Sequence, residues 1–535
     1  MTAPKWLCVG SRFASALKNG LVHNVDGMIN AQRERVVSTG ISGLDYILDG
    51  GLPANHLYLI EGDPGTGKTT LALQFLLEGR RSGEEGLYVT LSETKSELLT
   101  VAASHGWSID GIGVFELASL EQRLQAAEQY TVFHPSEVEL SETTKRICEE
   151  VERIQPTRVV FDSLSEMRLL AREPLRYRRQ VLALKQFFAG RQCTVVLLDD
   201  RTSLDTDLQL QSISHGVVLM ERMEVEYGGA RRRLMVAKMR GLRFREGHHD
   251  FSIQPGGLVV YPRLVAAEKR DLKGPLTGAP REEAKSGITE LDALMGGGIH
   301  YGTSTLVLGP AGSGKSTLLT QYAVALAQTG ERVACYLFEE TRENFVERAN
   351  GLGLDLQTQI EKGQVSLEQV DPAEMSPGEF LYKVRSAVEV KPGVKPARVV
   401  IIDSLNGYLN AMPSENFLVI QMHELLTYLN ERGVLTLMVL AQHGLVGAAM
   451  QSPVDVTYLA DTVIVLRYFE AFGEVKQAVA VVKKRTGGHE RNIREFRISS
   501  KGVHIGAPLR EFEGVLTGVP TFTGTKETLI QQNPS

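Results

Sequence analysis

Two matching stretches decide the fold of this chain, GDPGTGKT (Gly62–Thr69) and GPAGSGKS (Gly309–Ser316). Both fit the pattern G-x-x-x-x-G-K-[ST], and each stands between a short apolar segment and a longer amphipathic one. Glycines in such a loop let backbone N–H groups turn toward phosphate oxygens, and the dipole of the following helix adds to the attraction. The lysine reaches the β and γ phosphates, and the Ser or Thr hydroxyl binds Mg²⁺. The sequence therefore predicts two sites for ATP and Mg²⁺.

The residues of these two loops are the predicted ATP ligands. They are Gly65, Thr66, Gly67, Lys68, Thr69 and Thr70 in the first loop, and Gly312, Ser313, Gly314, Lys315, Ser316 and Thr317 in the second. Within this set, the hydroxyls of Thr69 and Ser316 are the predicted Mg²⁺ contacts.

The two loops belong to a long internal repeat. Their lysines are 247 residues apart, and the same offset links Gly40 to Gly287, Asp45 to Asp292 and Glu93 to Glu340. Farther along, Asp162 and Asp403 differ by 241 residues, and Lys238 and Lys483 by 245. Small insertions alone separate the halves, so the chain is a tandem duplication.

Each half alternates short apolar strands with longer amphipathic stretches, which predicts an α/β fold with a largely parallel central sheet. We expect strands at 56–61, 86–91, 158–162 and 194–198, and a helix over 69–77. The predicted organisation is an extension over 1–35, expected to be disordered, a first ATPase domain over 36–265 and a linker over 266–285. A second ATPase and kinase domain over 286–520 and a short tail over 521–535 follow.

Composition limits the class of protein. The 535 residues are 43% hydrophobic and 23% charged, with a net charge of −6. These values suit a globular protein with large cores and exclude a mainly disordered chain or a polybasic nucleic-acid coat. We find no apolar run of 18 residues, so no membrane span is predicted. The four cysteines are far apart in sequence, which favours a reduced, cytoplasmic protein.

Acidic residues stand where predicted strands end. Asp162 and Asp403 each close an apolar strand and precede Ser-Leu. A carboxylate there fits the Mg²⁺ role of a Walker B aspartate; the alternative is a helix cap.

The second predicted strand of each half ends on further carboxylates. The second half carries Glu339 and Glu340, whereas the first half carries Ser92 and Glu93. A carboxylate beside the γ-phosphate can orient or deprotonate water or a hydroxyl group, so Glu93, Glu339 and Glu340 are the predicted catalytic residues. The alternative is that these residues cap the next helix.

Basic residues end a late strand in each half. Lys238 and Arg240 in the first half match Lys483 and Arg485 in the second, and the segment from Arg231 to Arg245 holds seven basic residues and no acidic ones. These four residues are predicted to contact the phosphates of a neighbouring subunit, as arginine fingers do. The alternative is a solvated, charged hairpin.

The order of these motifs, repeated twice, resembles the KaiC family of duplicated RecA-like ATPases over roughly residues 36 to 520. Supporting stretches are Tyr468–Glu470, Arg494–Phe496, Ser499–Gly502 and Phe512–Pro520. The resemblance implies two tandem RecA-like P-loop domains in a double-tiered homohexamer. It also implies ATP hydrolysis in the first ring, serine/threonine autokinase activity in the second, and a role as a signalling or clock-type timer.

The resemblance places the phosphoacceptor pair at Thr457 and Tyr458. Thr457 lies four residues before Asp461, which with Thr462 opens a late strand. Glu339 would activate the acceptor hydroxyl, with Glu340 beside it. Ser92 departs from the catalytic glutamate of the family's first ring. Because the tail after Pro520 is 15 residues long, a KaiA-type activator is not expected, whereas a KaiB-like or other signalling partner is.

Two other functions compete with this interpretation. A nucleotide-gated scaffold would turn over ATP without making phosphoprotein, and the tyrosine at position 458 favours it. A RecA- or DnaB-like DNA motor would share the fold but needs a basic, aromatic-bearing pore. The negative net charge and the 7% aromatic content make nucleic acid an unexpected partner.

Overall fold

The computed structural model describes residues 35–116, 135–171, 173–201, 208–225, 227–266, 282–410, 417–442, 457–517 and 520–524. The chain divides into two compact units. The first comprises residues 1–223 and 232–262, and the second comprises residues 224–231 and 263–535. Nearly all of the predicted extension, linker and tail falls outside the described residues.

The first unit is built on a nine-stranded sheet in the order β11-β10-β9-β8-β3-β7-β6-β4-β5. Its strands are β3 (Leu57–Gly62), β4 (Gly86–Thr90), β5 (Gly113–Glu116), β6 (Arg158–Asp162), β7 (Thr194–Asp200), β8 (Gly216–Met223), β9 (Arg231–Met239), β10 (His249–Gln254) and β11 (Gly257–Tyr261). In this sheet, β8, β3, β7, β6, β4 and β5 run parallel to one another. The strands β9, β10 and β11 form an antiparallel extension at one side.

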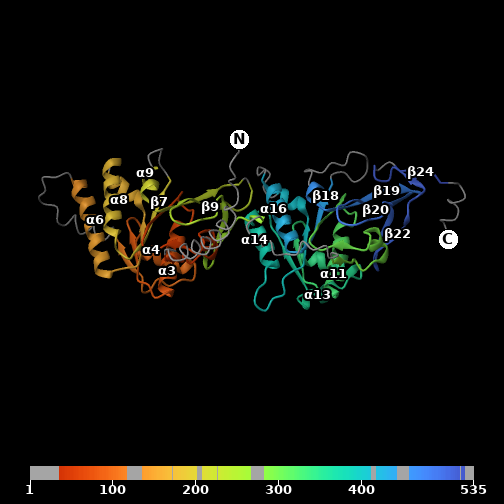
Figure 1. The fold of residues 1–535 in the computed structure, drawn as a ribbon, viewed down its shortest axis with the longest axis horizontal. Coiled ribbons are helices and arrows are strands. Elements are labelled where there is room, and N and C mark those ends of the chain that lie inside the picture. Colours follow the sequence, from red (N-terminus) through yellow and green to blue (C-terminus); the bar gives the residue numbers. More distant parts are fainter. Residues whose placement is uncertain are drawn as a thin grey trace, which may run out of the picture. The chain divides into compact units, whose positions relative to one another are not determined.

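Helices cover both faces of this sheet (Figure 1). They are α2 (Ser42–Ile47), α3 (Lys68–Arg81), α4 (Lys95–Ser104), α6 (Pro135–Ile154), α7 (Leu164–Ala171), α8 (Pro174–Phe188) and α9 (Leu208–Ile213). Side chains of α2, α3 and α4 pack with one set of alternate strand residues, and those of α6, α7 and α8 pack with the other set. The central strands are therefore buried on both faces, as their unbroken apolar runs predict.

The second unit repeats this topology in the order β16-β15-β17-β18-β14-β19-β20-β21-β22. Its strands are β14 (Ser304–Gly309), β15 (Val333–Leu337), β16 (Val365–Gln369), β17 (Val399–Asp403), β18 (Leu435–Ala441), β19 (Thr462–Ala471), β20 (Glu474–Lys484), β21 (Arg494–Ser499) and β22 (Gly502–Pro508). Its helices are α10 (Thr289–Leu294), α11 (Lys315–Gln328), α12 (Arg342–Gly351), α13 (Leu356–Glu361), α14 (Pro377–Val388), α15 (Leu405–Asn410), α16 (Leu418–Glu431) and the 3₁₀ turn η2 (Thr457–Leu459).

Three two-stranded ribbons complete the fold. They are β1 (Val36–Val37) with β2 (Leu52–Pro53), β12 (Glu283–Ala284) with β13 (Ile299–His300), and β23 (Phe512–Glu513) with β24 (Thr521–Phe522).

The repeated Gly and Asp before each phosphate loop are structural. Asp45 Oδ1 accepts hydrogen bonds from the Thr39 backbone N–H and hydroxyl, each at 2.7 Å. Asp292 Oδ1 accepts the same pair of bonds from Ser286, each at 2.8 Å. Between them, Gly40 has a positive φ of 77°, a conformation that costs glycine little. The motif closes the turn before α2, and its counterpart in the second unit does the same before α10.

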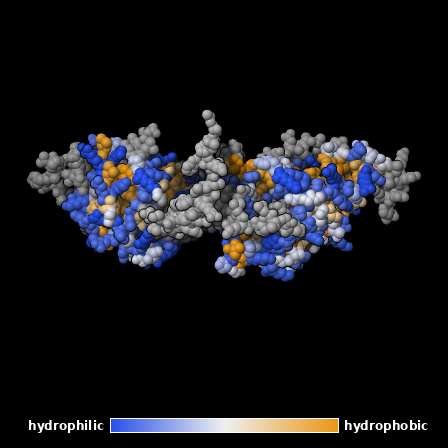
Figure 2. All heavy atoms as spheres, in the orientation of Figure 1, coloured by the Kyte–Doolittle hydropathy of each residue, from blue (hydrophilic) through white to orange (hydrophobic). Residues whose placement is uncertain are grey.

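The predicted α/β fold with two tandem RecA-like domains and largely parallel sheets is confirmed. The predicted strands agree with β3, β4, β6 and β7 to within two residues, although the helix predicted over 69–77 extends to Arg81 in α3. Within the part of the chain that is described, no helix is both long enough and apolar enough to span a membrane. The face of each unit seen in Figure 2 carries mostly hydrophilic residues with smaller hydrophobic groups between them.

Candidate nucleotide sites

Each phosphate loop joins the end of a central strand to a long helix. The first loop connects β3 to α3, and the second connects β14 to α11. The last glycine of each loop, Gly67 or Gly314, precedes its helix in the left-handed conformation, with φ of 102° and 93°. A side chain there would be strained, so glycine allows the backbone N–H groups to form a cradle for anions. Both loops thus have the geometry that the pattern predicts.

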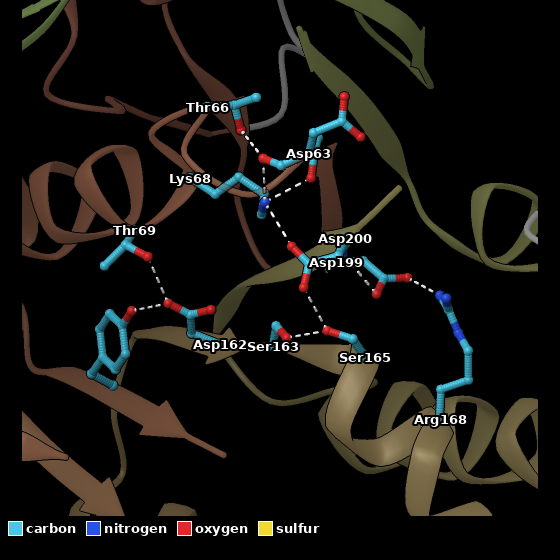
Figure 3. A network of polar contacts seen from close by, with 12 residues as sticks. Asp63, Thr66, Lys68, Thr69, Asp162, Ser163, Ser165, Arg168, Asp199 and Asp200 are labelled. Carbon is cyan, nitrogen blue, oxygen red and sulfur yellow. Dashed lines mark hydrogen bonds and ion pairs between the residues drawn. The ribbon is translucent and has the colours of Figure 1, made fainter. Parts of the chain in front are cut away.

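The loop lysines are buried. Lys68 Nζ donates to the carbonyls of Gly62 at 2.6 Å and Asp63 at 3.1 Å, and it lies 2.8 Å from the Asp200 carboxylate (Figure 3). Lys315 Nζ donates to the Pro310 carbonyl at 2.6 Å. Burial lowers the pKa of Lys315, although the nearby acidic residues partly oppose that shift. Each lysine therefore lies in the mouth of its loop, close to where phosphates would bind.

The two strand-ending aspartates lie beside the loop hydroxyls. Thr69 Oγ1 donates to Asp162 at 2.9 Å, and the buried Tyr88 hydroxyl also donates to this carboxylate (Figure 3). In the second unit the Ser316 hydroxyl is hydrogen-bonded to Asp403. Burial raises the pKa of both aspartates, while these hydrogen bonds oppose the shift.

This donor set fits Mg²⁺. One carboxylate and one hydroxyl supply hard oxygen ligands, and Mg²⁺ in nucleotide sites completes its octahedron with phosphate oxygens and waters. Among the described residues no group of three or more His, Cys, Asp or Glu side chains could hold a metal by itself. The protein residues that would hold a magnesium ion are Thr69 with Asp162 and Ser316 with Asp403.

The remaining loop hydroxyls have different partners. Thr66 Oγ1 donates to the Asp63 carbonyl at 2.8 Å, and Thr70 Oγ1 lies 3.4 Å from a His105 ring nitrogen. Arg348 Nη1 donates to Thr317 Oγ1 at 3.3 Å. The Ser313 hydroxyl is buried and has no hydrogen-bond partner within the described structure.

The predicted catalytic glutamates do not cap helices. The N-cap of α4 is Thr94, whose side chain accepts a hydrogen bond from Glu97 N, and the N-cap of α12 is Thr341. The glutamates stand just before these caps, at the carboxyl edge of β4 and β15. The capping alternative is therefore wrong.

The three glutamates differ in surroundings. Glu340 pairs with Arg348 at 2.7 Å, and the exposed Glu339 accepts a hydrogen bond from Ser404. Glu93 is half-buried, and its pKa is raised by burial and by the Asp162 charge. Ser92, at the position of Glu339, is exposed.

The basic residues that are predicted to contact a neighbouring subunit lie near the amino ends of the parallel strands. The phosphate loops lie at the carboxyl ends. Lys238 Nζ donates to the carbonyls of Gln211 at 2.6 Å and Ser214 at 2.8 Å, and Arg240 Nη2 donates to the Ser212 carbonyl at 3.1 Å. These carbonyls precede β8, which runs parallel to β3.

The second unit repeats the arrangement around the predicted acceptor pair. Lys483 Nζ donates to the Thr457 carbonyl at 3.0 Å, and Arg485 Nη2 donates to the Tyr458 carbonyl at 3.2 Å. Both acceptor residues lie in η2, and the Tyr458 side chain is 54% exposed.

The sequence motifs did not predict several residues at the two sites. Asp200 and Tyr88 contact the first site, and Arg348 and Ser404 contact the second. Comparison of the two repeats could have pointed to them. The residues equivalent to Asp200, Tyr88, Arg348 and Ser404 are, in that order, Ala441, Cys335, Val101 and Ser163. All but the last pair differ in chemical type.

Comparison with known families agrees with this geometry. The family model described as "ATPase: KaiC" matches residues 37–265 and again residues 284–510. The chain belongs to the KaiC family. It is 28% identical over 500 residues to the circadian clock protein KaiC3 of Synechocystis sp., an alignment that covers 92% of this chain and 95% of that protein.

Further KaiC-family relatives are similar over the same length. Identity to the circadian clock oscillator protein KaiC of Synechococcus elongatus is 27% over 492 residues, or 90% of this chain and 91% of that protein. Identity to its namesake from Parathermosynechococcus lividus is 27% over 496 residues, or 91% and 88%. This chain is thus a KaiC-family ATPase with two tandem domains.

Proposed function

We propose that this KaiC-family ATPase binds MgATP in both units, hydrolyses it in the first and uses it in the second to phosphorylate Thr457 or Tyr458. The observation that carries the proposal is the position of Glu339 and Glu340 at the carboxyl edge of β15, beside Asp403 and the second phosphate loop. Mg²⁺ would be held by Thr69 with Asp162 in the first unit and by Ser316 with Asp403 in the second, and it would supply positive charge that stabilises the transferring phosphoryl group.

The transfer takes place between chains. The phosphate loop follows β14, whereas η2 precedes β19, which is parallel to β14 with Thr305 opposite Thr462. Acceptors and loop therefore lie at opposite edges of one sheet. The six residues of β14 separate these edges by about 20 Å, far beyond the reach of a side chain. A phosphoryl group leaving one chain's site must be received by η2 of another chain.

The repeated basic residues also lie far from the phosphate loop of their own chain. Lys483 and Arg485 lie with η2 at the edge away from their own phosphate loop, as Lys238 and Arg240 do in the first unit. These residues would reach nucleotide across an interface, which supports a homohexameric ring with sites between subunits.

The chemistry assigned to Glu339 is that of a general base. The acceptor oxygen attacks the γ phosphorus, its proton passes to the Glu339 carboxylate, and the bond from phosphorus to the β–γ bridging oxygen breaks to release ADP. The hydrogen bond from Ser404 fixes this carboxylate. The exposed Tyr458 carries a hydroxyl that is suited to meet a second subunit.

In the cell, the protein would act as a cytoplasmic timer or signalling switch whose phosphorylation state is read by a KaiB-like or other partner. This role rests on the relatives named as circadian clock proteins.

A complementation experiment tests the kinase. Chains carrying Glu339→Gln are mixed with chains carrying Thr457→Ala and Tyr458→Phe, assembled with γ-labelled ATP and Mg²⁺, and the label is mapped by peptide. We expect no label in either variant alone and label on the Glu339→Gln chain after mixing. Label in the unmixed Glu339→Gln chain would refute the role of that glutamate. Phosphate release by the unaltered chain without any labelled protein would refute the kinase and leave a nucleotide-gated scaffold ATPase.

A further inference from the structure

An additional carboxylate reaches the first phosphate site from β7. Asp200 pairs with Gly62 in the parallel register of β7 and β3, so it lies next to the start of the loop. Its Oδ1 is 2.8 Å from Lys68 Nζ, and its side chain keeps 27% exposure. Figure 3 shows the Asp200 carboxylate beside the Lys68 ammonium group. Because a lysine at this loop position reaches the β and γ phosphates, Asp200 would lie next to bound nucleotide.

The preceding residue shows that the orientation of Asp200 is built into the site. Successive side chains of a strand point to opposite faces. Asp199 is 1% exposed and is held by an ion pair with Arg168, and its Oδ1 accepts from the Asp200 N–H at 3.0 Å. With Asp199 fixed on the other face, Asp200 is directed toward the loop.

The second unit has no carboxylate at this position. The sheet registers place Ala441 opposite Gly309, as Asp200 is opposite Gly62. Asn406 bonds the Ala441 backbone there, with Ala441 N donating to Oδ1 at 2.7 Å. The equivalent of Asn406 is Ser165, which instead donates to the Asp200 side chain at 2.9 Å.

The serine that follows each Walker B aspartate is connected to a carboxylate in both units, directly in the second and through Ser165 in the first. In the second unit Ser404 donates directly to Glu339, which follows β15. In the first unit the matching Ser163 contacts Ser165, and Ser165 donates to Asp200 on β7. The residue at the position of Glu339 is Ser92. The serine pair Ser163 and Ser165 thus leads to a carboxylate on β7, whereas Ser404 bonds the carboxylate after β15 directly.

We propose that Asp200, acting beside Glu93, positions the attacking water in the first site, where Ser92 stands at the position of Glu339. This inference rests on the proposed hydrolysis of ATP in that site. The water oxygen attacks the γ phosphorus and its proton passes to Asp200. The bond to the β–γ bridging oxygen breaks, ADP leaves with that electron pair, and the proton follows to the released phosphate.

The ion pair with Lys68 has a rival explanation with the opposite consequence. Asp200 would hold the lysine away from phosphate and so inhibit the site. Removing its charge would then speed turnover, whereas loss of a water-positioning carboxylate slows it.

The test uses the full-length chain with Glu339→Gln and Glu340→Gln, so that turnover reports on the first site while the second keeps its phosphate loop. Into this background we introduce Asp200→Asn, Asp200→Glu and, as a matched charge control, Asp110→Asn. Asp110 is exposed and accepts from Ser108. ATP turnover gives kcat and KM, and a fluorescent ATP analogue gives affinity.

We expect Asp200→Asn to lower kcat by about tenfold or more with KM unchanged or lower, because a negative charge near the phosphates is lost. Asp200→Glu should regain part of kcat, and Asp110→Asn should match the background. An unchanged or raised kcat in Asp200→Asn would overturn the inference, as would a joint loss of kcat and ATP affinity, which marks a structural role. A background that releases no phosphate would refute hydrolysis in the first site, and this role with it.

Discussion

The Arg348 guanidinium donates two hydrogen bonds to the Glu340 carboxylate, from Nη2 to Oε2 at 2.7 Å and from Nε to Oε1 at 3.2 Å. Its third nitrogen donates to Thr317 of the phosphate loop at 3.3 Å. The first unit has Val101 at the position of Arg348. The second site therefore balances its extra glutamate with a cation from its own chain, while Glu339 is held by Ser404.

Replacing Arg348 by valine, the residue of the first unit, should weaken ATP binding in the second site. Glu340 would keep its charge beside the phosphates without a counter-ion, and a loss of about tenfold in affinity corresponds to roughly 1.4 kcal/mol. Binding is measured with a fluorescent ATP analogue in a chain whose first loop carries Lys68→Ala. Arg342→Met, an exposed change on the same helix, is the control. Equal affinities for both variants would contradict the role of Arg348.

The paired hydroxyl and carboxylate of each site predict a shared dependence on Mg²⁺. Ser316→Ala and Thr69→Ala each remove a hydroxyl proposed as an oxygen ligand, so each variant should need about tenfold more Mg²⁺ for half-maximal activity of its own site. Phosphorylation is titrated with Mg²⁺ for Ser316→Ala and phosphate release for Thr69→Ala, after EDTA has stopped both reactions. Thr100→Ala, on the exposed face of α4, should behave as the unaltered chain. Activity that persists in excess EDTA would exclude the metal.

Tyr88→Phe should destabilise the first unit. The Tyr88 side chain is 1% exposed and donates to the buried Asp162 carboxylate, and a hydrogen bond to a charged group contributes about 1.5–3 kcal/mol. Burial raises the pKa of Asp162 and this bond opposes the shift, so the variant should also favour protonated Asp162. Urea unfolding without nucleotide measures the effect, with the exposed Tyr227→Phe as control. Identical midpoints would show that the bond contributes nothing.

Local sequence was enough to predict the two phosphate loops and the aspartates that end β6 and β17. Their spacing alone defines them, and strand alternation with helices fixes the α/β class. The capping alternative for the glutamates could have been rejected from sequence too, because Thr94 and Glu97 form a Thr-x-x-Glu capping box.

The spacing of residues along the sequence could not predict contacts that depend on which strands pair. Asp200 and Lys68 are far apart in sequence, and they meet because β7 pairs with β3. Similarly, Arg348 reaches Glu340 from the last turn of α12. Position-by-position comparison of the two repeats would have found both, since each differs in charge from its counterpart.

The thiol of Cys193 gives a test of stability against pH. Burial raises its pKa to about 12, so between about pH 9 and 12 the folded chain keeps a proton that the unfolded chain releases. The free energy of unfolding should therefore fall as pH rises above about 9, by at most about 1.4 kcal/mol per pH unit for this group. Urea unfolding at pH 8 and 10 should show a smaller decline in Cys193→Ala. An unchanged slope would mean that the thiol ionises equally in both states.

Ser404→Ala tests how the base of the second site is held. The change removes the hydrogen bond to Glu339 but leaves the carboxylate, so phosphorylation should slow by about tenfold. Loss of the proposed general base in Glu339→Gln should slow it more, by about 10²–10⁴. ATP affinity should stay the same, because Ser404 contacts Glu339 rather than the phosphate loop. The matched control is Ser163→Ala in the first unit, which should leave phosphorylation unaltered, since Ser163 contacts Ser165 in the other site. If both alanine variants slowed phosphorylation equally, the effect of Ser404→Ala would not come from its hydrogen bond to Glu339 but from a general change in the assembled protein.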